Sequence, residues 1–170
     1  ALKPDFAMAH YNFGNLLREL SKPEAAVASY HKAIAINPAY AEMHNNLGSA
    51  LKDLGKFEES EASYQRAITL KPAYADAHYN LGTALQGLGN SDEAVASYRK
   101  TIALKPDYTE AHNNLGAALR DLGKPEEAVA SYHKALDLKP NYAEAHNNLG
   151  AALHELGRLE EAVASYHEAL

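Results

Sequence analysis

The sequence is organised around one stretch of 34 residues, Thr109–Tyr142, which reads TEAHNNLGAALRDLGKPEEAVASYHKALDLKPNY. Shifting the sequence by 34 residues aligns this stretch with four other segments, 7–40, 41–74, 75–108 and 143–170. Residues 109–136 and 143–170 are identical at 22 of 28 positions. A fixed period of about 20 to 50 residues indicates a repeat architecture. The sequence therefore predicts five stacked copies of one structural unit.

Each repeat, numbered here from position 1 to position 34, divides into two helical halves. In the first half, apolar residues recur at positions 3, 7, 10, 11 and 14, the spacing of one helical stripe. Position 15 is glycine in four copies, and glycine accepts the left-handed conformation that ends many helices. The second half has apolar residues at positions 20, 21, 24, 27 and 28, an acidic residue at 18 and, in four copies, proline at 32. Acidic residues favour helix starts and proline prevents continuation, so each repeat is predicted to be a hairpin of two antiparallel helices.

Small residues predict how the two helices of a hairpin pack. Position 8 is glycine in every copy, although glycine inside a helix costs about 1 kcal/mol relative to alanine. Position 24 is tyrosine in every copy, and the second helix is the neighbour expected to exclude a side chain at position 8. Ser60 at position 20 and Thr101 at position 27 add hydroxyl groups, which we expect to bond a preceding helical carbonyl.

Leu-Gly at positions 7 and 8, Gly at 15, Ala at 20, Tyr at 24, Ala at 27 and Pro at 32 together resemble the tetratricopeptide repeat. The resemblance covers the whole chain. It implies an all-α fold: an α-solenoid of antiparallel helix hairpins in five 34-residue repeats, wound into a right-handed superhelix as a single domain over residues 1–170. The first helix of each hairpin would line the concave side, and stability would come from stacking of neighbouring hairpins.

Polar residues on the first helix of each hairpin form a candidate binding surface, because positions 2, 5, 6, 9, 12 and 13 lie opposite the apolar stripe. Position 6 is always asparagine, whose amide offers a donor and an acceptor to a peptide unit. The residues predicted to bind a peptide are Asn12, Asn46, Asn80, Asn114 and Asn148 at position 6, Tyr11, Asn45, Tyr79, Asn113 and Asn147 at position 5, and Asn15, Ser49 and Thr83 at position 9.

The chain is also similar to the repeat region of O-linked N-acetylglucosamine transferases and related bacterial arrays, in which such an asparagine ladder grips peptide substrates. The resemblance thus implies a scaffold that binds an extended peptide or protein segment in its concave groove. The alternative for the asparagines is a structural one, in which each amide fixes the helix pair by bonding a neighbouring backbone group.

Charges on this surface predict the kind of ligand. Some tetratricopeptide domains bind a carboxylate through basic residues at positions 2, 5 and 6, but position 2 here is acidic in four copies and position 6 is never basic. Position 13 is acidic in four copies, and position 12 is basic in three. These charges favour a neutral or mildly basic ligand over an acidic tail.

The composition argues against several other classes of function. A net charge of −6 argues against nucleic acid, and the chain has no apolar run of the length of a membrane span and no cysteine. Five of the nine histidines lie at position 4, one per repeat, which predicts packed histidines rather than a metal site. We find no catalytic constellation, and so predict a non-enzyme without cofactors or metal in a cytoplasmic, intracellular setting.

The ends of the repeat frame leave two interpretations open. Residues 1–6 read as positions 29–34 of a preceding repeat, and Leu170 falls at position 28. Neither end carries a polar capping helix, which repeat arrays normally need. The chain is therefore expected to be a fragment of a larger protein. Alternatively, it is a structural or engineered array with no dedicated ligand, which associates head to tail through its uncapped ends.

Overall fold

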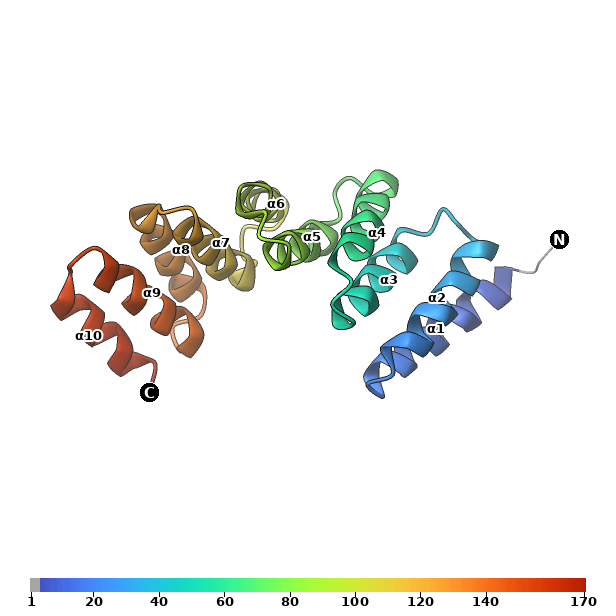
Figure 1. The fold of residues 1–170 in the computed structure, drawn as a ribbon, viewed down its shortest axis with the longest axis horizontal. Coiled ribbons are helices and arrows are strands. Elements are labelled where there is room, and N and C mark those ends of the chain that lie inside the picture. Colours follow the sequence, from blue (N-terminus) through green and yellow to red (C-terminus); the bar gives the residue numbers. More distant parts are fainter. Residues whose placement is uncertain (1–3) are drawn as a thin grey trace. The chain divides into compact units, whose positions relative to one another are not determined.

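The computed structural model describes residues 4–170, and this part of the chain forms ten α-helices (Figure 1). The helices fall into two compact units, the first ending at Leu88 and the second beginning at Gly89. Unit 1 contains α1 (Pro4–Glu19), α2 (Pro23–Ile36), α3 (Ala41–Asp53), α4 (Phe57–Leu70) and α5 (Ala75–Gly87). Unit 2 contains α6 (Ser91–Leu104), α7 (Thr109–Asp121), α8 (Pro125–Leu138), α9 (Ala143–Glu155) and α10 (Leu159–Glu168).

Helices that follow one another in the chain pack together within each unit. The hairpins are α1–α2 and α3–α4 in unit 1, and α7–α8 and α9–α10 in unit 2. The second helix of each hairpin also packs against the first helix of the next repeat, and first helices touch one another in the pairs α1–α3, α3–α5 and α7–α9. These contacts confirm the predicted all-α array of helical hairpins.

The turn inside each hairpin depends on one residue with positive φ. Gly55, Gly89, Gly123 and Gly157 have φ between +70° and +78°, where a side chain would be strained. In the first repeat Ser21 takes this conformation at φ 56°. Its turn still forms the same closing bonds, Ser21 N to Arg18 O at 2.9 Å and Lys22 N to Leu17 O at 2.9 Å. Serine therefore keeps the turn, at the cost of a conformation that L-residues disfavour.

Tyrosine rings occupy the space beside the glycines at position 8, as the sequence predicts. A Cβ atom added to Gly48 would lie 2.7 Å from Cε1 of Tyr64, and one added to Gly116 would lie 2.6 Å from Cε1 of Tyr132. Both rings are completely buried. The absence of a side chain on the first helix is thus what lets the second helix approach closely enough to bury its tyrosine.

Histidines at position 4 bind the loop that joins consecutive repeats. In four repeats the ring Nε2 lies within hydrogen-bond distance of the carbonyl oxygen of the proline six residues earlier. The pairs are His44–Pro38 at 2.9 Å, His78–Pro72 at 3.0 Å, His112–Pro106 at 2.9 Å and His146–Pro140 at 2.7 Å. The predicted structural role of these histidines is confirmed.

The structure corrects two local expectations. Helix α1 begins at Pro4 rather than at Ala7, because proline suits the first turn of a helix as well as the end of one. The Ser60 hydroxyl bonds the carbonyl oxygen of Gly48 on the facing helix at 2.7 Å, not a carbonyl of its own helix. Thr101 does bond the carbonyl of Ser97, four residues back, at 3.1 Å. Residues 1–3, read from the sequence as part of a preceding repeat, lie outside the described residues.

Candidate functional site

The candidate site is the surface of the first helices that carries positions 5, 6, 9, 12 and 13, here called the ladder face. It belongs to α1, α3 and α5 in unit 1 and to α7 and α9 in unit 2. Between α1 and α3 this face is hollowed into a cavity of about 380 Å³, lined by Asn15, Arg18, Glu19, Asn46 and Asp53. Amide and charged groups therefore line one hollow.

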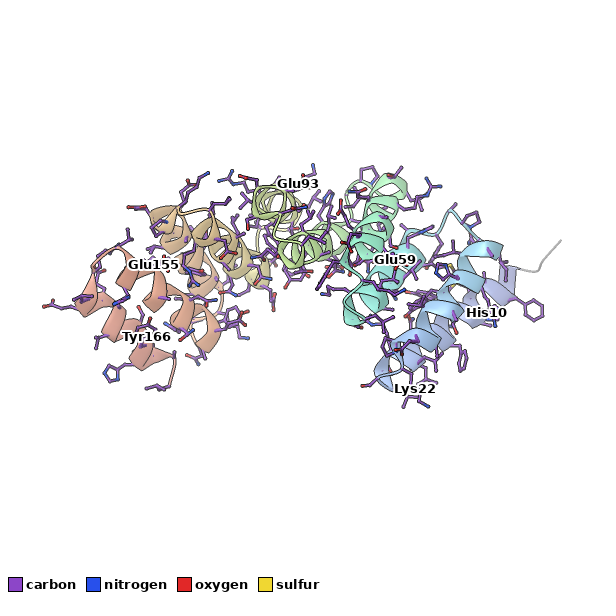
Figure 2. All side chains as sticks on the ribbon, in the orientation of Figure 1. His10, Lys22, Glu59, Glu93, Glu155 and Tyr166 are labelled. Carbon is purple, nitrogen blue, oxygen red and sulfur yellow. The ribbon has the colours of Figure 1, made fainter. Side chains whose placement is uncertain are left out.

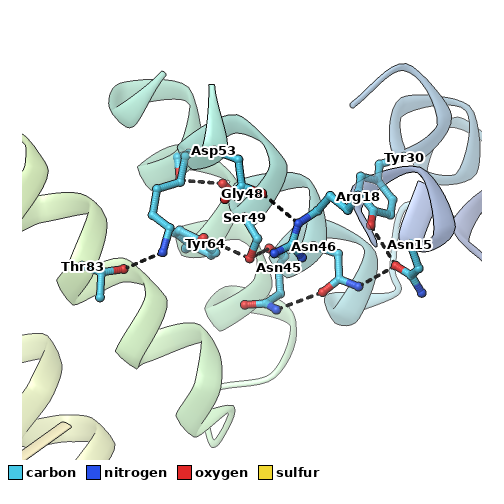
Figure 3. Close-up of polar contacts among 12 residues, drawn as sticks. Asn15, Arg18, Tyr30, Asn45, Asn46, Gly48, Ser49, Asp53, Tyr64 and Thr83 are labelled. Atoms are coloured by element: carbon cyan, nitrogen blue, oxygen red, sulfur yellow. Dashed lines mark hydrogen bonds and ion pairs between the residues drawn. The ribbon is translucent and has the colours of Figure 1, made fainter. Parts of the chain in front are cut away.

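The amides of unit 1 are hydrogen-bonded from one repeat to the next (Figure 3). Asn46 Nδ2 donates to Asn15 Oδ1 on α1 at 2.9 Å. It also donates to Tyr11 Oη on the same helix at 3.0 Å. Asn45 Nδ2 donates to Asn46 Oδ1 at 3.2 Å. Asn80 Nδ2 on α5, not drawn in that view, donates to Asn45 Oδ1 at 3.0 Å. The asparagines are therefore linked by their side chains across three helices, which the sequence did not reveal.

Unit 2 repeats the same arrangement. Asn148 Nδ2 on α9 donates to Asn113 Oδ1 on α7 at 3.1 Å, and Asn113 Nδ2 donates to Asn114 Oδ1 at 3.2 Å. Asn113 Nδ2 also lies 3.0 Å from Glu144 Oε1. In both units, therefore, position 6 of one repeat binds position 5 of the repeat before it.

Positions 5 and 6 differ in how far they can reach a ligand. Asn45 is 6% exposed and Asn113 only 1%, so their amides lie beneath the surface and hold their neighbours in place. The other position-5 residues are half-buried (Tyr11 and Tyr79) or exposed (Asn147). At position 6, Asn12 is exposed, and Asn46, Asn80, Asn114 and Asn148 are half-buried. The position-6 amides thus border the surface, while two of the position-5 amides support them.

Position 9 receives the hydroxyl of the buried tyrosine. Tyr30 Oη donates to Asn15 Oδ1 at 2.8 Å, and Tyr64 Oη donates to Ser49 Oγ at 3.1 Å (Figure 3). Thr83 Oγ1 donates to the main-chain carbonyl oxygen of Asn80 at 2.8 Å. Asn15 and Thr83 are half-buried, and Ser49 is buried. Position 9 therefore couples the two helices of a hairpin as well as bordering the ladder face.

In the fourth and fifth repeats position 9 is alanine, which offers the tyrosine hydroxyl no side-chain acceptor. The Tyr132 hydroxyl is buried and has no hydrogen-bond partner among the described residues. Burial raises the pKa of Tyr132 to about 12, and it does the same for Tyr30. A buried hydroxyl without a partner costs about 1–3 kcal/mol.

Charges at positions 12 and 13 pair between repeats. Arg18 Nε on α1 lies 2.9 Å from Asp53 Oδ2 on α3, and Arg120 Nε on α7 lies 3.4 Å from Glu155 Oε1 on α9. These pairs neutralise two of the carboxylates that the sequence places on this face. Opposite charges at positions 12 and 13 of consecutive copies could have indicated them in advance.

Figure 2 draws the side chains of the part of the chain that the structure describes. Residues 4–170 contain no group of three or more His, Asp or Glu side chains placed to hold a metal ion. None of the ten helices has the length and apolar character that crossing a bilayer requires.

The fold and this face define a class, the helical-hairpin repeat proteins. Models of the tetratricopeptide repeat match residues 14–55, 48–89 and 117–157, residues 75–108, and residues 97–130. The chain belongs to the tetratricopeptide repeat family. No curated protein sequence matches it.

Solved structures of tetratricopeptide repeat proteins resemble the chain over nearly its whole length. A crystal structure of MamA is 26% identical with a TM-score of 0.86, covering 92% of this chain and 91% of that one. YrrB, described as a TPR protein with an unusual peptide-binding site, is 25% identical with a TM-score of 0.80, covering 96% and 84%. MamA from Desulfovibrio magneticus RS-1 is 21% identical with a TM-score of 0.91, covering 99% and 95%, and shows the fold alone. The family and the likeness to YrrB support a role in protein–protein interaction.

Proposed function

We propose that the ladder face binds an extended peptide or protein segment, without catalysis, through the position-6 amides. The observation that carries this proposal is that each unit holds half-buried position-6 amides by hydrogen bonds, and that one of them, Asn46, lines a cavity of about 380 Å³. The Asn80 side chain uses one amide hydrogen to bind Asn45, and its second amide hydrogen and its side-chain oxygen Oδ1 have no partner among the described residues. A peptide unit presents one acceptor and one donor, which match these two groups.

The amide links within each unit support this proposal, because a held amide loses little rotational freedom on binding a ligand. Asn45 holds Asn80 in unit 1, and Asn113 holds Asn148 in unit 2. Backbone recognition of this kind makes few demands on ligand sequence. The ligand is therefore defined by its extended conformation and by a small number of side-chain contacts.

The matched variants Asn80→Ala and Asn45→Ala test the proposal. Both remove the hydrogen bond between these residues, so each should lower stability by about 1 kcal/mol, and Asn45→Ala also loses the bond to Asn46. Asn80→Ala removes the half-buried amide itself and should weaken binding of peptides selected from a random 12-residue library by about tenfold, whereas Asn45→Ala only frees that amide to rotate and should weaken binding less. Circular dichroism and isothermal titration calorimetry measure the two effects. Equal peptide affinity for both variants would contradict the proposal and favour a purely structural role for the asparagines.

Exposed apolar side chains at both ends favour a second candidate, self-association of the array. Phe13 and Leu16 on α1 are 53% and 50% exposed, and Leu159 and Val163 on α10 are 57% and 55% exposed. The equivalents of Phe13 and Leu16 on α3, Leu47 and Ala50, are buried in a cluster against which Val27 of α2 packs. A second copy could therefore contact the two ends as one repeat contacts the next. Sedimentation at increasing concentration tests this candidate, and a monomer at every concentration would exclude it.

A further inference from the structure

Lys52 differs from the other cations of the ladder face because it has no carboxylate partner. It occupies position 12 of α3, as Arg18 does on α1 and Arg120 on α7. Those two arginines pair with acidic residues at position 13 of the next repeat. Position 13 of the repeat after Lys52 is Gly87, and no carboxylate among residues 4–170 lies within ion-pair distance of the Lys52 ammonium.

Packing explains why the partner is absent. A Cβ atom at Gly87 would lie 2.5 Å from Cε1 of Phe57, whose ring comes from α4. The ring therefore fills the space that an acidic side chain would need in order to leave the helix. Aromatic packing at Gly87 of α5 thus takes the place of the ion pairs that join α1 to α3 and α7 to α9.

The surroundings hold the Lys52 ammonium on the ladder face. Its Nζ donates to Thr83 Oγ1 on α5 at 3.4 Å, a long contact for a hydrogen bond (Figure 3). Thr83 in turn donates to the main-chain carbonyl oxygen of Asn80, three residues earlier on α5. Burial lowers the pKa of Lys52, while Asp53 acts in the opposite direction and Arg18 in the same direction as burial. Asp53 itself is bound to Arg18, so the charge of Lys52 is not compensated by direct contact.

We infer that Lys52 receives a carboxylate of the bound peptide segment. This inference rests on the proposed peptide-binding function and adds a preference to it: acidic groups at the α3–α5 part of the ladder face. A carboxylate there supplies the counter-charge that Gly87 cannot, and a charge-assisted hydrogen bond to an ammonium is stronger than a neutral one. The charges of the sequence predict a neutral or mildly basic ligand for the surface as a whole, but at Lys52 we expect an acidic group.

Selection from a random 12-residue peptide library displayed on phage tests the inference. Peptides that bind the wild-type protein should be enriched in Asp and Glu, and Lys52→Met should remove this enrichment. Methionine keeps much of the length of the side chain, so packing of the stem is retained. The matched control is Lys32→Met, which removes the same charge from an exposed site on α2, and Lys52→Arg should restore the acidic preference.

A selected peptide, synthesised with a free and with an amidated carboxyl end, then identifies the source of the carboxylate. Lys52→Met should weaken its binding about tenfold, and this difference should shrink as salt is raised. Loss of affinity on amidation would assign the site to a chain terminus, and equal affinity would assign it to a side chain.

Two results would overturn the inference, and they are distinguishable. Enriched peptides without excess Asp or Glu, bound equally by Lys52→Met, would refute the carboxylate site and leave peptide binding intact. Failure to enrich any peptide would refute the proposed function and this inference together.

Discussion

The hairpins of unit 1 and the hairpin α7–α8 of unit 2 share one helical pattern but differ in the hydrogen bonding of the tyrosine buried between their helices. In unit 1 the hydroxyls of Tyr30 and Tyr64 donate to Asn15 and Ser49 on the facing helix. In unit 2 the hydroxyl of Tyr132 is buried without a partner among the described residues. The tyrosine rings fill equivalent spaces in both units, so the difference lies in whether the hydroxyl has a hydrogen-bond acceptor and not in how the ring packs. Near-identical repeats can therefore differ in local stability because of a single residue, the one at position 9.

The largest expected change in the free energy of unfolding comes from adding a methyl group beside a tyrosine ring. Gly48→Ala and Gly116→Ala each place a Cβ atom within 2.7 Å of a ring carbon, so each should cost about 1–3 kcal/mol, partly offset by the better helix propensity of alanine. Gly48→Ala should cost more, because its ring is fixed by the bond from Tyr64 to Ser49 while the Tyr132 ring can shift. Urea denaturation with hydrogen exchange in each unit measures both costs. A larger cost in unit 2 would contradict the comparison.

Removing one hydroxyl should have opposite signs in the two units. Tyr30→Phe breaks a 2.8 Å hydrogen bond and should destabilise unit 1 by about 1 kcal/mol. Tyr132→Phe removes a buried group that has no partner, and should stabilise unit 2 by about 1 kcal/mol. Thermal denaturation and hydrogen exchange report both changes.

Two serine substitutions are matched controls for the tyrosine pair. Ala117→Ser supplies a position-9 hydroxyl like that of Ser49, and should also stabilise unit 2. Ala151→Ser should have little effect, because Tyr166 in its hairpin is 37% exposed and can bond water. Destabilisation by both Tyr→Phe variants would show that the Tyr132 hydroxyl does have a partner.

The smallest expected effect is a pH dependence confined to unit 1. Lys71 Nζ lies 2.8 Å from Glu42 Oε1, and this hydrogen bond lowers the pKa of Glu42, against a smaller opposing effect of burial. A carboxylate with a lowered pKa stabilises the fold above its unfolded pKa of about 4.3, and this contribution is lost as the pH falls below that value.

The matched variant in unit 2 is Glu110→Gln, at the same repeat position as Glu42 but with no lysine partner among the described ion pairs. Glu42→Gln should slightly lower the urea midpoint at pH 7 and leave it unchanged at pH 3. Glu110→Gln should leave the urea midpoint unchanged at both pH values. An effect of Glu42→Gln that persists at pH 3 would show that the ion pair is not its cause.

Much of the fold was predictable because every repeat carries the same local signals. Glycine at position 15, proline at position 32 and the apolar spacing predicted the hairpins, and glycine at position 8 opposite tyrosine at position 24 predicted their close packing. The candidate site was less predictable. Helical periodicity placed positions 5 and 6 on one face, but it could not show that Asn45 and Asn113 are buried while Asn80 and Asn148 border the surface.

By itself, then, the sequence determined the helices, their turns and the glycine–tyrosine packing, because these depend on residues close in the chain or repeated at a fixed period. Only the tertiary structure decided which groups meet across repeats. It links Asn80 to Asn45, pairs Arg18 with Asp53, and sets the Phe57 ring against Gly87. Such contacts join side chains about one repeat apart, and whether two groups meet or miss depends on helix packing to within about 1 Å, which periodicity does not specify.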